Sequence, residues 1–148
     1  MQRRQILIGL GAVTVAASAG YVALRPAEAE QQLTPPELLE RVRAKEVILI
    51  DIRRPDEWAA TGVAEGALPI DMRSKDFAAR ISAAMQAAPG RPVAVICARG
   101  VRSRRVTAWL EKNGLSSVID VPEGMLGSSA GPGWVARGLP VTFDATKS

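Results

Sequence analysis

The chain has a single cysteine, Cys97, which lies between an apolar strand pattern at 93–96 and a basic helical pattern that begins near Val101. A thiol at a helix N-terminus is close to unpaired backbone N–H groups and to the positive end of the helix dipole. Both features stabilise the thiolate, which is the nucleophilic form of cysteine. Arg99 and Arg102 add positive charge within the same loop. We therefore expect Cys97 to be a nucleophile whose pKa is lowered, in a loop that attracts anions.

The composition excludes several other kinds of chemistry. The 148 residues contain no histidine, so Ser-His-Asp and Cys-His catalysis and most zinc sites are excluded. One cysteine forms no internal disulfide and no CxxC redox pair. The net charge is only +4 and aromatic residues make up 4%, so we predict no nucleic-acid partner. We also predict no metal and no cofactor.

The remaining pattern predicts an α/β fold, in which a parallel sheet is flanked by helices on both faces. Apolar content of 47% is enough for a core, and strands alternate with helices along the chain. The first helix starts at Pro35, with Thr34 as its N-cap and Glu37 completing a capping box. The segment 122–138 is rich in glycine and is predicted to be loop-like. Strands are predicted at 47–52, 67–70, 93–96 and 118–121, and helical segments at 55–58, 75–87 and 101–113.

Residues 1–30 are predicted to be a signal peptide or a membrane anchor, ahead of a domain at 31–148. Arg3 and Arg4 precede an uncharged apolar stretch at 6–24, which is close to the length needed to cross a bilayer as a helix. Ala27-Glu28-Ala29 then resembles a signal cleavage site. Positive charge before the apolar stretch favours an inside N-terminus. We therefore expect an N-terminal hydrophobic helix and an exported domain, either periplasmic or anchored to the inner membrane and facing outward.

Three segments in this order resemble one known family. They are Asp51-Ile52-Arg53 followed by Glu57-Trp58, the loop 97–103, and Glu123-Gly124 followed by Trp134 and the segment 138–141. Together they span about residues 34–143. The chain is similar to the single-domain rhodaneses, which are sulfurtransferases with a C-x-x-G-x-[RT]-S active-site loop. The resemblance implies a rhodanese-like fold for the domain.

The resemblance also implies an activity and its residues. Cys97 would carry sulfane sulfur as a persulfide, taken from thiosulfate or a similar small anion and passed to a thiol or to cyanide. Arg102 would bind the donor, and Asp51 and Arg53 would hold the strand end in place. The cradle around the sulfur would be formed by the loop residues Ala98, Arg99, Gly100, Val101, Arg102 and Ser103.

The sequence departs from the family in two places. The family usually has Gly-His-Ile where this chain has Gly62-Val63-Ala64, and the segment 125–133 is longer than in compact members. The missing histidine lies away from the nucleophile in the sequence, so we expect little effect on the chemistry. We expect the longer segment to reshape the rim of the substrate pocket.

Three other interpretations remain open at this stage. Cys97 could be only a small buried apolar residue. A cysteine-dependent phosphatase or arsenate reductase has the pattern C-x5-R, but here Arg102 is the fifth residue after Cys97, so the loop is one residue too short. A membrane-tethered module of the same fold could bind a partner or relay sulfur without turnover.

Overall fold

The computed structural model describes residues 32–143. The predicted signal peptide or anchor at 1–30, and the hydrophobic helix expected within it, lie outside the described residues. Among the residues that the structure describes, no helix combines the length and the apolar character that crossing a bilayer requires.

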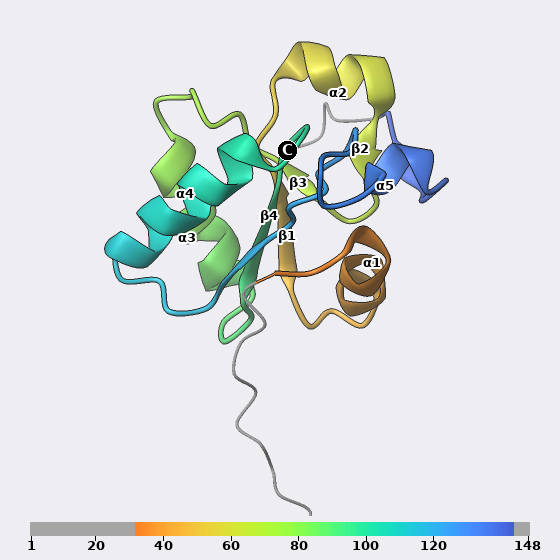
Figure 1. Ribbon diagram of the computed structural model, residues 1–148. Coiled ribbons are helices and arrows are strands. Elements are labelled where there is room, and N and C mark those ends of the chain that lie inside the picture. The colour runs from red at the N-terminus through yellow and green to blue at the C-terminus, as the bar shows by residue number, and fades with distance from the viewer. Residues whose placement is uncertain (1–31, 144–148) are drawn as a thin grey trace, which may run out of the picture.

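Four parallel strands form the central sheet, in the spatial order β3-β1-β4-β5 (Figure 1). In the register, Ile50 of β1 pairs with Val95 of β4, and Val95 pairs with Asp120 of β5. Every residue of β1 and β4 is buried, as expected of central strands covered on both faces. The strand bounds are β1 (Ile48–Asp51), β3 (Leu68–Pro69), β4 (Val93–Ile96) and β5 (Val118–Asp120).

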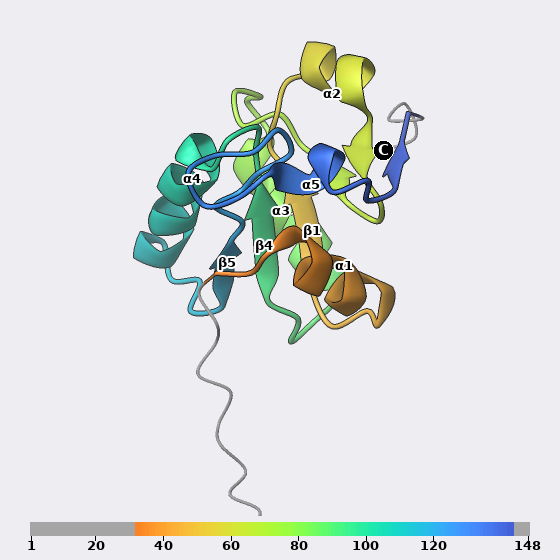
Figure 2. The same ribbon diagram turned by 45° about the vertical axis from the view of Figure 1, so that its right-hand side comes forward.

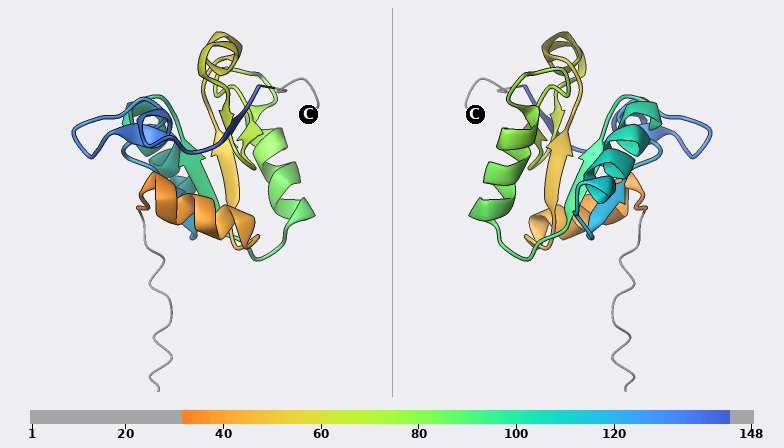
Figure 3. Two further views of the ribbon diagram at one scale, coloured as in Figure 1. Left: turned by 90° about the vertical axis from the view of Figure 1, so that its right-hand side faces the viewer. Right: turned by 90° about the vertical axis from the view of Figure 1, so that its left-hand side faces the viewer.

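Helices cover both faces of this sheet, which confirms the predicted α/β architecture. In Figure 3, α1 is in front of the sheet in one view, and α3 and α4 are in front in the other; Figure 2 shows α1 and α4 apart across the sheet. Because successive side chains of a strand point to opposite faces, the core is divided into two apolar clusters. One contains Trp134 and the other contains Cys97. The helices are α1 (Pro35–Arg43), α3 (Phe77–Ala87), α4 (Val101–Lys112) and α5 (Gly133–Ala136).

Two of the helices begin with the capping chemistry that their sequences indicate. Glu37 accepts a hydrogen bond from the Thr34 N–H at 2.9 Å, as a capping box requires. The helix α2 (Pro55–Thr61) begins in the same way, because Glu57 accepts from the Arg54 N–H at 3.1 Å. This helix extends three residues beyond the predicted segment 55–58 and lies beyond the carboxyl ends of β1 and β4 (Figures 1 and 3).

The structure differs from the prediction in its shortest elements. Two strands that the sequence did not predict, β2 (Val63–Ala64) and β6 (Val141–Thr142), form an antiparallel pair. Two residues are too few to show an alternating pattern. The segment 122–138, predicted to be loop-like, contains the four-residue helix α5. Its start depends on a distant contact, since the Gly133 N–H donates to the buried Glu123 carboxylate at 2.9 Å.

Candidate active site

Cys97 follows the last residue of β4, at the carboxyl edge of the sheet, and α4 begins four residues later. Between them the chain turns at Gly100, whose φ is +78°, in the left-handed region that glycine adopts readily. The turn directs the Gly100 N–H at the Cys97 Sγ, with a distance of 3.2 Å. On the other side, the Sγ lies 3.6 Å from the hydroxyl of Ser103, in the first turn of α4. The sulfur is therefore held between a backbone donor and a hydroxyl.

The sequence analysis expected the residues 98–103 to form a cradle around the Cys97 sulfur, and the structure shows one hydrogen bond from the backbone of this loop to the Sγ. Within the loop 98–103, the amide of Gly100 is the one whose hydrogen bond reaches the Sγ. The Cys97 side chain is 1% exposed and belongs to the apolar cluster on the α3 and α4 face of the sheet. In this respect it matches the interpretation of a small buried residue. The sulfur is therefore covered by the residues packed around it.

The segment after β5 packs directly against the cysteine loop. A Cβ on Gly100 would collide with the carbonyl of Pro122, and one on Gly124 would collide with the carbonyl of Ala98. The Leu126 N–H donates to the Ala98 carbonyl at 2.8 Å. These contacts require glycine at both positions and fix the outer side of the loop.

The two loop arginines have different partners. Arg102 forms a two-point ion pair with Glu57 of α2, with Nη1–Oε2 and Nη2–Oε1 distances of 2.8 and 2.6 Å. These bonds raise the pKa of Arg102 above its ordinary value. Arg99 instead donates to the carbonyl of Gly127 at 3.3 Å. The guanidinium that the resemblance assigns to donor binding is thus already bound to a carboxylate.

Glu57 is held by donors from two helices. Its carboxylate accepts from the Arg54 N–H at the start of α2 as well as from the Arg102 guanidinium. The bonds from Arg102, above all, lower the pKa of Glu57 to about 2. The sequence placed Glu57 in a family motif but gave no sign of its partner, which is 45 positions away.

Acid should remove this contribution to stability. A carboxylate whose pKa is lower in the folded than in the unfolded chain stabilises the fold above its ordinary pKa of 4.5, and the effect is lost as pH falls to about 2. We expect Glu57→Gln to have a lower melting temperature than the unmodified protein at neutral pH. The difference should shrink between pH 4.5 and 2, which thermal unfolding across this range measures. A constant difference would mean that the ionised form of Glu57 contributes nothing specific.

Asp51 and Arg53 form a fully buried ion pair at the end of β1. Both side chains are 0% exposed, and the Arg53 Nη2 lies 2.7 Å from an Asp51 carboxylate oxygen. Arg53 also donates to the Gly62 carbonyl at 2.7 Å and to the Thr61 hydroxyl at 2.8 Å. The pair thereby connects the strand end to the C-terminal end of α2, the helix that carries Glu57.

A polar cavity of about 270 Å³ lies on the outer side of the cysteine loop. Arg99 and Arg104 line it, together with Ser128 from the longer segment 125–133, so that segment does form part of the site's rim. The cavity also reaches Asp120, a residue at the end of β5 that is 5% exposed. Burial raises the pKa of Asp120, although a hydrogen bond with Ser103 opposes the shift. The sequence analysis did not find this carboxyl, because nothing in the local pattern distinguishes it.

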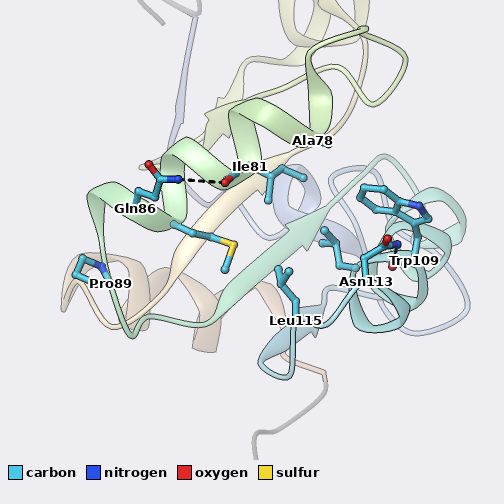
Figure 4. Close-up of a pocket in the computed structure, with 10 residues that line it drawn as sticks. Ala78, Ile81, Gln86, Pro89, Trp109, Asn113 and Leu115 are labelled. Atoms are coloured by element: carbon cyan, nitrogen blue, oxygen red, sulfur yellow. Dashed lines mark hydrogen bonds between the residues drawn. The ribbon is translucent and has the colours of Figure 1, made fainter.

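A second, apolar groove of about 620 Å³ lies between α3 and α4 (Figure 4). Ile81, Met85 and Trp109 are among its lining residues, and none of the lining residues belongs to the cysteine loop. The groove is therefore separate from the candidate active site.

A parallel sheet covered on both faces, with a cysteine in the turn between a central strand and the next helix, defines an α/β protein with a cysteine at the carboxyl edge of its sheet. A family model described as the rhodanese-like domain matches residues 34–130. The chain belongs to this family, as its sequence motifs indicated. Proteins with this fold are often sulfurtransferases, which act with a sulfur donor and a thiol acceptor.

Two similar solved structures carry rhodanese names, and one curated relative is named for a different activity. A rhodanese-like domain protein from Staphylococcus aureus is 28% identical, with a TM-score of 0.50, and the match covers 66% of this chain and 89% of that protein. A rhodanese-related protein from Thermoplasma volcanium shares the fold, with 24% identity, a TM-score of 0.58 and coverage of 77% and 99%. A tRNA uridine(34) hydroxylase from Synechococcus elongatus is 29% identical over 110 residues, which cover 74% of this chain. This chain spans only 41% of the length of that hydroxylase.

Proposed function

We propose that this protein is a sulfurtransferase that carries sulfane sulfur as a persulfide on Cys97. The observation that carries the proposal is the position of the Sγ between the Gly100 amide, 3.2 Å away, and the first turn of α4. An N–H donor and a helix N-terminus both favour negative charge on sulfur. Family membership supports the same activity.

The proposed reaction has two displacement steps on sulfur. The Cys97 thiolate attacks the outer sulfur of thiosulfate, the S–S bond of the donor breaks, and sulfite leaves with the electron pair. A thiolate or cyanide then attacks the outer sulfur of the persulfide, and the Cys97 thiolate leaves. Neither step requires a general base once the thiolate has formed, which fits a chain without histidine.

The place of action is a further part of the proposal. The charge and apolar pattern of residues 1–30 supports an exported domain, periplasmic or anchored to the inner membrane through that segment. Association with a membrane rests on this pattern alone.

Intact-mass measurement tests the central step. After exposure of the full chain to thiosulfate, we expect the mass to increase by one sulfur atom, and we expect treatment with a thiol or with cyanide to reverse the increase. Repeated turnover distinguishes an enzyme from a relay module, which would load once and release sulfur only to a specific partner. A chain whose mass stays unchanged with thiosulfate and with other sulfane donors would contradict the proposal.

A further inference from the structure

The Glu57–Arg102 ion pair brings a negatively charged carboxylate to the candidate site, which the loop sequence alone does not indicate. Both terminal nitrogens of the Arg102 guanidinium donate to the Glu57 carboxylate oxygens, at 2.6 and 2.8 Å. The Arg102 side chain is 29% exposed and that of Glu57 is 16% exposed, so solvent screens the pair only in part. The positive charge of Arg102 is therefore offset before any donor arrives.

Glu57 cannot leave this position at low cost. Its carboxylate completes the capping of α2, and the Arg54 side chain approaches it as well, with an Nε–Oε2 distance of 3.3 Å. Its pKa, lowered to about 2, keeps it ionised at neutral pH. A donor that binds to Arg102 must then displace a fixed carboxylate or share the guanidinium with it.

We propose that Glu57 determines donor specificity by selecting against doubly charged sulfur donors. This inference rests on the proposed sulfurtransferase function. A thiosulfate dianion next to the ionised Glu57 has two negative charges to accommodate, whereas an organic thiosulfonate has one and an organic persulfide has one or none. The preferred class is thus a sulfane-sulfur donor with an organic group in place of one charged oxygen.

The chemical step is the same for such a donor. The Cys97 thiolate attacks the outer sulfur of an organic thiosulfonate, its S–S bond breaks, and the organic sulfinate leaves with the electron pair. The two probes, thiosulfate and methanethiosulfonate anion, therefore differ by one unit of charge and not in the bond that breaks. Their ratio of kcat/KM measures charge selection at the site.

The variant Glu57→Gln tests the proposal in the full chain. Glutamine still accepts the capping hydrogen bond at this position, so α2 is retained. Removing one like charge near the donor should raise kcat/KM for thiosulfate by about tenfold relative to methanethiosulfonate. In the unmodified protein, added salt should narrow the gap between the two donors. The double variant Glu57→Gln/Arg102→Gln should lose the gain, because removing the guanidinium as well returns the pair to zero net charge.

Glu65→Gln is the matched control. Glu65 also pairs with an arginine, Arg43, at 2.7 Å, but on an exposed surface, so its donor ratio should stay unchanged. An unchanged donor ratio in Glu57→Gln, including an equal loss of activity with both donors, would overturn the proposal. If the unmodified chain loads sulfur from neither donor, the sulfurtransferase function fails as well. If the unmodified chain does load sulfur but Glu57→Gln leaves the kcat/KM ratio of the two donors unaltered, only the proposed charge selection by Glu57 is contradicted.

Discussion

Replacing Cys97 with serine will abolish sulfur transfer, with a loss of more than about a thousandfold in turnover. A serine hydroxyl is neither ionised at neutral pH nor able to form a persulfide, and the chain has no second cysteine to take over. The Gly100 N–H can still donate to the serine oxygen, so the loop should keep its shape. Transfer rates and intact mass after donor exposure measure the effect, and thermal unfolding shows whether the fold is retained.

A relocated thiol provides the control for this experiment. In Cys97→Ser/Ser116→Cys, a cysteine on an exposed residue replaces the buried one. If the environment of position 97 activates the sulfur, this double variant should show no turnover. Transfer by the single serine variant would point to another nucleophile, and transfer by the double variant would show that any thiol suffices.

Replacing Arg53 with methionine will destabilise the fold by about 3–5 kcal/mol, because Asp51 is then left as a buried charge without its partner. Both side chains are 0% exposed, so water cannot replace the lost guanidinium. A domain of this size has a total stability of about 5–15 kcal/mol, so the variant should be largely unfolded well below the normal melting temperature. Chemical denaturation of the two proteins gives the difference in unfolding free energy.

The chain contains a matched exposed pair of the same geometry. Arg73 binds Asp71, also two residues earlier, with an Nη2–Oδ2 distance of 2.6 Å, but the Arg73 side chain is 60% exposed. Arg73→Met should therefore cost no more than about 1 kcal/mol. The double variant Asp51→Asn/Arg53→Met should recover part of the loss, since no charge is left unpaired. Equal losses at the two arginines would show that burial does not decide the effect.

The repeated arrangement shows why burial could not be read from the local sequence. Asp51-Ile52-Arg53 and Asp71-Met72-Arg73 have the same acid and base at the same spacing, and both form the same local hydrogen bonds. The first pair differs in that Arg53 also binds Thr61 and Gly62 at the C-terminal end of α2 and is fully buried. The resemblance to a family motif distinguished it, but the residue pattern by itself did not.

The sequence by itself determined the order of the longer strands and helices, the capping of α1, and the place of Cys97 between β4 and α4, because these depend on residues close together in the chain. The tertiary structure decided what surrounds that cysteine. Packing of α2 beyond the sheet brings Glu57 to Arg102, the approach of the segment after β5 closes the loop, and the apolar cluster buries the sulfur. Such contacts join elements far apart in sequence, and their energies depend on distance and burial, which only the folded chain sets.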